Sequence, residues 1–279
     1  MTNDSIWSQL SADAAERLKT LRATHARPAS VTAVGQRRAA SPLASAIGGP
    51  AWRPSAETPW PMDHRGFPMM HLARINFTEM TPLDGFPAEG IVKIFISTEA
   101  IVFGEDQPHG NGFVVEWHPA PGPGVLAPQP ALDEEGDEGT PLVGGDPDID
   151  YDDDDPLAGT VYQDGAALSF SRATMEPGYE LPAICAFADA ELGALAPFRP
   201  RDFRKRAGET LPPVWVGGWP HSVQDSEAGE DDVVLLQVGN GEDETFMFAG
   251  DIGCASFLIS PEDLAARRFE RVRYGSAGY

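Results

Sequence analysis

Seven residues have side chains that could bind a ligand or transfer a proton, and they lie in or beside motifs that occur twice in the chain. Imidazole and carboxylate groups are common acids and bases in enzymes, while indole rings can line grooves for peptides or carbohydrates. These candidate binding residues are Trp60, His71, Arg74, Trp219, His221, Gln237 and Asp251. An enzymatic site built from them would combine Asp251 with a histidine where the two motif copies meet.

Each kind of candidate also has a purely structural interpretation, and the sequence leaves both open. Asp251 lies in Gly250-Asp251-Ile252-Gly253, which is typical of a tight turn whose carboxylate binds nearby backbone amides. A lone histidine is more often a surface or packing residue than a ligand. Tryptophans on proline-rich segments can fill the ends of a sheet instead of lining a groove.

Known catalytic and cofactor motifs are absent from the sequence. It has no Gly-x-Ser-x-Gly elbow, no phosphate-binding glycine loop, no HExxH pair and no CxxC pair. Alternating carboxylates from Asp146 to Asp152 begin like a calcium-binding loop, but Tyr151 and Leu157 stand where an EF-hand needs glycine and glutamate. We therefore expect no catalytic residue, no metal site and no cofactor, with only weak cation association at this acidic stretch.

The charge of the chain restricts its partners. The 279 residues carry a formal charge of -23, from 43 acidic and 20 basic residues. Nucleic acids and anionic membranes bind clustered lysine and arginine, so we expect neither as a partner, whereas a basic protein fits. No apolar run of about 18 residues is present, and Cys185 and Cys254 have apolar neighbours, which indicates a cytoplasmic protein with reduced thiols. The oligomeric state stays open.

Local patterns predict the elements that must position the candidates. Residues 1–27 are expected to hold one amphipathic helix, because apolar residues from Ile6 to Leu21 recur at helical spacing before Pro28. Strands are predicted over 70–77, 91–97, 112–118 and 167–171, and helices over 182–195 and from Ser260 to about Arg268. The segment 48–68 is rich in proline and glycine and should be irregular, and proline with repeated acids predicts a mobile acidic loop over 119–160.

The same order of motifs occurs over about 41–118 and about 214–274. Each copy has a glycine pair, a proline, a strand-like run and then a strand that ends in serine. Two copies of one supersecondary unit usually bury their apolar faces against each other. We therefore expect an α+β, β-rich fold in which two intertwined pseudo-symmetric repeats form one compact domain over 28–279, preceded by the N-terminal helix.

The repeated segments resemble the YwqG-like family of bacterial proteins, whose domain has no known function. The matching segments are Ser45 to Pro50 with Trp60-Pro61, Leu72 to Phe77, Gly85-Phe86-Pro87 with Gly90, Phe95 to Ser97, Gly218-Trp219-Pro220 with Gln224, Leu235 to Gln237, and Gly250 to Gly253 with Phe257 to Ser260. This resemblance, over 41–274, implies a compact β-rich α+β fold of two related halves and brings no established activity. Family members tend to have glutamine where this chain has Arg74.

Two functional hypotheses from different classes follow. The first is a cytoplasmic, non-enzymatic binding protein that neutralises a basic protein, as an immunity protein neutralises a toxic nuclease. The second is an uncharacterised hydrolase or small-molecule-binding protein with its site at the junction of the two copies. The lack of a coherent catalytic set in the sequence favours the first hypothesis.

Overall fold

A ten-stranded antiparallel sheet forms the body of the protein. The computed structural model describes residues 5–35, 39, 41–97, 109–130, 165–197, 200–222, 228–239 and 253–277. The strands of the large sheet, in their order across it, are β12 (Arg273–Ala277), β11 (Cys254–Ile259), β10 (Val233–Val238), β9 (Val214–Gly217), β1 (Arg27–Val34), β8 (Ala166–Met175), β2 (Ala46–Ile47), β4 (Met70–Asn76), β5 (Ile91–Ile96) and β6 (Phe113–His118). A separate two-stranded sheet pairs β3 (Ala51–Arg53) with β7 (Val125–Ala127).

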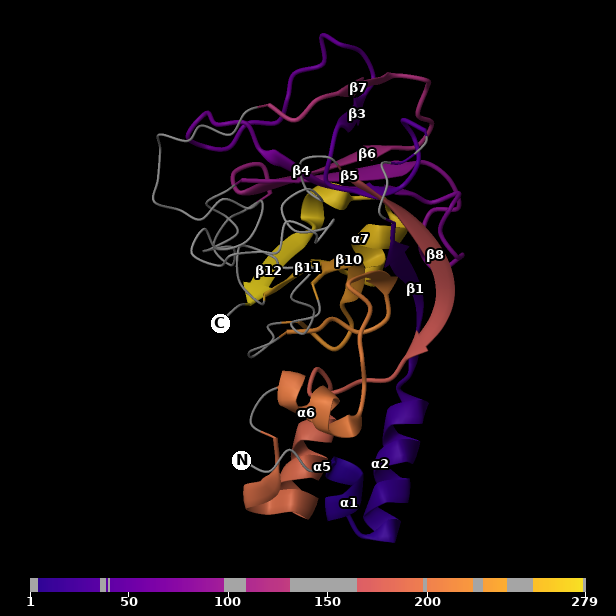
Figure 1. The fold of residues 1–279 in the computed structure, drawn as a ribbon, viewed down its shortest axis with the longest axis vertical. Coiled ribbons are helices and arrows are strands. Elements are labelled where there is room, and N and C mark those ends of the chain that lie inside the picture. Colours follow the sequence, from indigo (N-terminus) through magenta and orange to yellow (C-terminus); the bar gives the residue numbers. More distant parts are fainter. Residues whose placement is uncertain are drawn as a thin grey trace, which may run out of the picture.

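The sheet is bent so that its two arms face each other. Figure 1 shows β4, β5 and β6 in one layer and β10, β11 and β12 in the other, joined through the long strands β1 and β8. The largest core lies between the layers and includes Ile94 of β5 and Val238 of β10. At the edges, the ring centroid of Phe113 in β6 lies 6.0 Å from that of Phe257 and 5.9 Å from that of Tyr274 in β12. These aromatic contacts nearly close the sheet.

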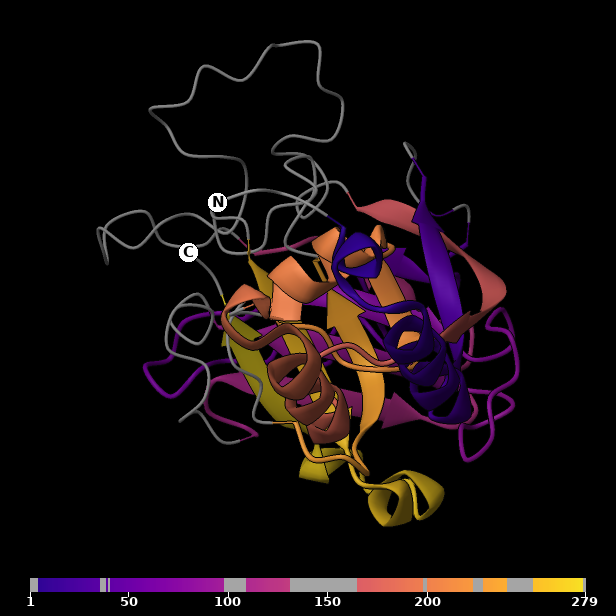
Figure 2. The ribbon, with the colours of Figure 1, turned by 90° about the horizontal axis from the view of Figure 1, so that it is seen from below.

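The outer faces of the two layers have different covers. The small sheet of β3 and β7 lies over the layer of β4, β5 and β6 (Figure 1), and Ala51 of β3 shares an apolar cluster with Phe95 of β5. The helices are α1 (Ile6–Gln9), α2 (Ala12–Thr24), α5 (Pro182–Leu192), α6 (Pro200–Ala207) and α7 (Pro261–Ala265), with 3-10 turns η2 (Gly193–Leu195) and η3 (Phe269–Arg271). Figures 1 and 2 show α1, α2, α5 and α6 gathered at one end of the molecule, where Leu18, Ile184 and Phe203 form a second core with Trp219.

A register shift in β4 decides which side chains share a face. Side chains alternate along a strand, so His71 and Arg74, three positions apart, would normally point to opposite faces. The pairing of β4 with β5 shifts after His71, so that His71 lies opposite Phe95 while Arg74 lies opposite Lys93. Phe95 and Lys93 are two positions apart and share a face, which is the face covered by β3. The irregularity therefore brings two candidate residues to the same side of the sheet.

Most predicted elements are confirmed, with changed boundaries. The strands over 70–77, 91–97 and 112–118 are β4, β5 and β6, the strand over 167–171 is the longer β8, and the helix over 182–195 is α5 followed by η2. The single N-terminal helix is instead two helices, because Ser11 accepts a hydrogen bond from the Ala14 backbone and caps a new start. Ser260 caps α7 as predicted, but α7 ends at Ala265.

Several described elements have no counterpart in the sequence prediction, among them β1, β9, β12 and α6. The strand β1 contains Pro28, which argues against a central strand, but this proline lies before Ala29, where pairing with β9 begins. The predicted irregular segment contains β3, and the predicted acidic loop is described only as far as Pro130, where it includes β7. Residues 131–160 of that prediction lie outside the described residues. Within the described ranges, no helix is both long and apolar enough to cross a membrane.

Candidate functional site

The described candidate residues form two polar clusters, one on the outer face of each layer. His71 and Arg74 belong to β4, with Trp60 nearby, and Gln237 belongs to β10, with Trp219 and His221 nearby. The structure therefore brings His71 together with Arg74, and His221 together with Gln237, on different arms of the sheet. Asp251 lies outside the described residues, so its predicted pairing with a histidine stays a prediction.

A row of charged side chains crosses the first layer beneath β3. Arg74 lies opposite Lys93, and Lys93 lies opposite Glu116 in β6. Lys93 Nζ donates to the Trp52 carbonyl at 2.9 Å and forms an ion pair with Glu116. Arg53 Nη1 lies 3.0 and 3.1 Å from the two Glu116 carboxylate oxygens. Arg53, Lys93 and Arg74 are all buried, so β3 covers a row that is rich in positive charge.

Burial and charge shift the pKa values of this row. Burial lowers the pKa of Lys93 to about 8, although Glu116 acts to raise it. Burial, and then the charge of Arg74, lower the pKa of His71 to about 3, so this imidazole is neutral at pH 7. Burial acts to raise the pKa of Glu116, but the hydrogen bond from His118 and the Lys93 charge outweigh it and bring the value to about 2.

His71 and Arg74 hold the chain on both sides of the first glycine pair. His71 Nδ1 lies 3.0 Å from the Gly49 carbonyl, so Nδ1 carries the proton and Nε2 is left as an acceptor. Within the described residues, this buried Nε2 has no hydrogen-bond partner. Arg74 donates from Nε to the Ala44 carbonyl at 2.7 Å and from Nη1 to the Pro50 carbonyl at 3.3 Å. Arg74 thus binds the backbone both before and after β2.

The tryptophans of the first arm differ in their surroundings. Trp60 donates from Nε1 to the Met69 carbonyl at 2.7 Å and packs edge-on against Phe95, with 5.4 Å between ring centroids. Trp52 in β3 forms part of a pocket of about 370 Å³, whose other lining residues are Pro54, His118, Pro119, Ala120, Pro121, Gly122, Pro123 and Gly124. The His118 ring packs edge-on against Trp52, with centroids 4.9 Å apart. Trp52 therefore lines a pocket, and a groove for peptide or carbohydrate at the tryptophans stays a hypothesis.

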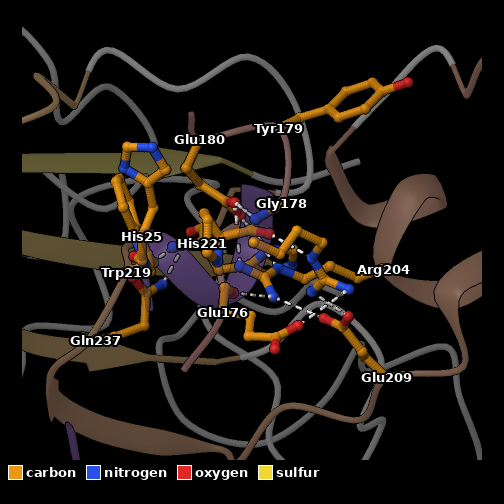
Figure 3. A network of polar contacts seen from close by, with 12 residues as sticks. His25, Glu176, Gly178, Tyr179, Glu180, Arg204, Glu209, Trp219, His221 and Gln237 are labelled. Carbon is orange, nitrogen blue, oxygen red and sulfur yellow. Dashed lines mark hydrogen bonds and ion pairs between the residues drawn. The ribbon is translucent and has the colours of Figure 1, made fainter. Parts of the chain in front are cut away.

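Glu180 is the centre of the second cluster (Figure 3). Its carboxylate accepts hydrogen bonds from the Gly178 backbone at 2.7 Å and from Arg204 Nη2 and Nε at 3.0 and 3.2 Å. His221 Nδ1 lies 3.4 Å from Glu180 Oε1, the oxygen that Arg204 Nε also binds. Arg204 Nη1 also donates to Glu209 at 2.9 Å. Burial acts to raise the pKa of Glu180, but the Arg204 charge and the His221 contact outweigh it and bring the value to about 2.

Gln237 holds the segment that follows the second glycine pair. Its Oε1 accepts from the His221 backbone N–H at 3.1 Å, and its Nε2 donates to the His221 carbonyl at 3.0 Å. Trp219 donates from Nε1 to the His25 carbonyl at the end of α2, at 2.9 Å. Arg74 in β4 and Gln237 in β10 therefore have the same structural role. Each side chain binds the backbone segment that follows a glycine pair, Arg74 through its guanidinium group and Gln237 through its amide.

The chemistry available to the second cluster is that of an imidazole held against a buried carboxylate. Such a pair can act as a general base when the other imidazole nitrogen reaches a substrate. In this cluster the Glu180 oxygens are already occupied by Arg204 and Gly178 as well as His221. Among the described residues, no three His, Cys, Asp or Glu side chains gather in a way that could hold a metal ion.

Sequence reasoning did not identify the residues that dominate both clusters. These are Arg53, Lys93, Glu116, Glu180 and Arg204. One signal was available, because Lys93 is the single charged residue in the otherwise apolar run from Ile91 to Ile96. Such a lysine must find a partner when the strand is buried. The Glu180–Arg204 pair left no comparable signal, because the two residues lie on different segments joined only by folding.

The chain was compared with known proteins by sequence. No curated protein matches it. A family model matches residues 45–277, a range that contains every strand of the sheet except β1 and includes both polar clusters. Because this match covers most of the chain, the protein belongs to the family described as "Domain of unknown function (DUF1963)".

Proposed function

We propose that the protein binds a basic protein partner and neutralises it. The observation that carries this proposal is the distribution of charge. Residues 131 to 164 contain thirteen acidic residues and no basic residue. The rest of the chain does not balance this excess, because it also has more acidic than basic residues, 30 against 20. The unbalanced acids are therefore available to attract a partner of opposite charge.

Electrostatic attraction of this kind has a specific signature. At 0.15 M ionic strength, charges interact over a screening length of only about 8 Å, and the range is longer at low salt. An acidic stretch therefore raises the association rate most at low ionic strength, while close contacts set the dissociation rate. We expect binding that weakens steeply as salt is added.

The test is a calorimetric titration of the full chain with a lysine-rich synthetic peptide, carried out at 20 and at 200 mM salt. A variant that combines Asp152→Asn, Asp153→Asn, Asp154→Asn and Asp155→Asn should bind at least fivefold more weakly at low salt. The matched control removes four charges elsewhere, by Asp13→Asn, Glu16→Gln, Glu57→Gln and Glu262→Gln, all at exposed positions. If both variants bind the peptide equally weakly, only the net charge matters, which would contradict a role for the acidic stretch. Binding of the same affinity at both salt concentrations would also contradict the proposal.

A cytoplasmic location and a YwqG-like relationship belong to the same proposal. The two cysteines, Cys185 and Cys254, are free thiols, which supports a reducing compartment. A toxic basic protein made in the same compartment would be a suitable partner, because neutralisation there protects the cell that makes it.

We also propose that the two arms arose by internal duplication. Three features support this. Each arm begins with a short strand followed by two glycines of positive φ, Gly48-Gly49 and Gly217-Gly218. Each arm continues outward through three antiparallel strands to the sheet edge. The second strand of both arms, β4 and β10, carries a register shift before its candidate residue, Arg74 or Gln237.

A second candidate function is a hydrolase or small-molecule-binding protein, and one observation favours it. His221 Nδ1 faces the buried Glu180 carboxylate, which would orient the imidazole as a general base. The binding function is better supported, because both Glu180 oxygens already accept hydrogen bonds from Arg204 or the Gly178 backbone. These contacts give Glu180 a structural role.

A further inference from the structure

The pocket beside Trp52 lies within an exposed apolar surface. Trp52 itself is 2% exposed and forms the floor, while Pro54, Pro119 and Pro123 are exposed at the walls. The strand β7 continues this surface directly after Gly124, with Val125 38% and Leu126 42% exposed. These are two of the five large apolar residues that are exposed in the described part of the chain. Apolar surface concentrated around a pocket is typical of a protein contact site.

The surroundings of the pocket select an uncharged occupant. Lys93 Nζ lies 5.3 Å from the centroid of the Trp52 ring, and Arg53 follows Trp52 in β3. A second cation placed against this indole would be repelled by both. The only ionisable lining residue, His118, faces Glu116 with its Nε2 at 3.5 Å. Arg53 and Lys93 share the single carboxylate of Glu116, so the charge beside the pocket is positive on balance and disfavours the lysines and arginines of a basic partner inside it.

The lining of the pocket suits an aromatic side chain. Its volume of about 370 Å³ is near the lower end of the range of about 300–1,000 Å³ for small-molecule sites. The proline rings and an edge-on Trp52–His118 pair offer apolar surfaces to an aromatic ring. Aromatic residues are also the most common energetic anchors of protein interfaces.

We propose that the Trp52 pocket binds an aromatic side chain of the basic partner, an inference that rests on the proposed function. The partner's cations then lie around the anchor and not in it. Chain connectivity supports this arrangement, because Asp133 follows Gly124 by nine residues and cannot lie more than about 30 Å from it. The acidic stretch thus begins within reach of the pocket that receives the anchor.

The test compares two synthetic peptides of equal charge on the full chain. Both contain eight lysine and glycine residues around a central position, which is phenylalanine in one and alanine in the other. Calorimetry at 50 mM salt should show the phenylalanine peptide binding at least tenfold more tightly than the alanine peptide. Equal affinities would overturn the pocket while leaving the proposed function intact, and binding of neither peptide would overturn both.

A matched pair of variants tests whether the preference for the phenylalanine peptide arises at the Trp52 pocket. Gly122 lines the pocket, and a Cβ added there meets nothing within 4 Å, so Gly122→Leu can fill the space without disturbing the fold. Gly275 in β12 is equally open, and Gly275→Leu adds the same side chain elsewhere. We expect the tenfold preference to fall below twofold in Gly122→Leu and to persist in Gly275→Leu. A preference that survives in Gly122→Leu, with unchanged thermal unfolding, would place the aromatic site elsewhere and overturn the inference.

Discussion

At the scale of single residues, buried charges persist because neighbouring groups replace the water they lose. Glu180 is 7% exposed overall and is held by Arg204, His221 and the Gly178 backbone. Removal of one member of such a group leaves another charge buried without compensation, which typically costs about 3–5 kcal/mol. We therefore expect isosteric substitutions that remove a charge from the second polar cluster to lower the stability of the protein.

Glu180→Gln should lower the free energy of unfolding by about 3–5 kcal/mol at pH 7, because Arg204 loses its buried charged partner and keeps only the partly exposed Glu209. The pKa of Glu180 is lowered to about 2, so its stabilisation is present above about pH 4.5 and is lost as the pH falls toward 2. Denaturant unfolding of both proteins should show a difference that shrinks across this range. Glu262→Gln, at a side chain 86% exposed, is the control and should change stability by less than about 0.5 kcal/mol.

The same substitution separates the structural role from the alternative catalytic one. If His221 is a general base oriented by Glu180, the wild type should hydrolyse some ester, phosphoester or amide substrate. Glu180→Gln should then lose more turnover than its loss of folded protein explains. An absence of turnover on all three substrate classes would count against the hydrolase.

At the scale of elements, the turn that leaves β9 depends on glycine. Gly217 and Gly218 have φ values of 72° and 67°, a region that other residues adopt at a cost. A Cβ on Gly217 would lie 2.9 Å from the Pro28 carbonyl oxygen and 2.7 Å from Leu83 Cδ1. The carbonyl belongs to the backbone of β1 and accepts a hydrogen bond from Gly218, so it has little freedom to move.

Gly217→Ala should therefore lower the free energy of unfolding by about 2–4 kcal/mol, from backbone strain and steric overlap together. Gly122→Ala is the matched control, because its added Cβ meets nothing within 4 Å. The control should lie within about 0.5 kcal/mol of the wild type. Denaturant unfolding measures both, and equal stabilities would show that the turn can relax around a side chain.

At the scale of the whole molecule, one aromatic group joins the two ends of the sheet. Phe113 lies at the start of β6, on one edge, and contacts Phe257 of β11 and Tyr274 of β12 at the opposite edge. Phe113 is 1% exposed. Its contacts link the last strands of both arms.

Phe113→Ala should cost about 3–5 kcal/mol and should loosen both edges together. Hydrogen exchange measured by mass spectrometry is the appropriate readout, since it reports each strand separately. We expect faster exchange in β6 and also in β12, which is remote in sequence. Val125→Ala, at a residue 38% exposed, should leave both edges unchanged. Faster exchange in β6 alone would mean that the edges are stabilised independently.

The sequence predicted those features that depend on neighbouring residues. Apolar runs predicted β4, β5 and β6, and Ser260 followed by proline and acids predicted the start of α7. These predictions succeed because alternation and capping are local properties. The split between α1 and α2 was not predicted, since the apolar stripe continues past Ser11 and hides the second cap.

Only the tertiary structure decided which side chains meet. A one-position register shift in β4 puts Arg74 and His71 on one face, and no local pattern encodes such a shift. Across the first arm this register produces the charged row of Arg74, Lys93 and Glu116. The corresponding pairing in the second arm aligns Gln237 with Ser256, which are uncharged. The sequence by itself determined the apolar strands, the glycine turns and the acidic excess, because these follow from residue type and spacing. The fold decided that the strands of the first arm carry a buried row of charges beside an apolar pocket, while the second arm packs against helices and the buried Glu180–Arg204 pair. Burial and pairing depend on contacts between distant segments.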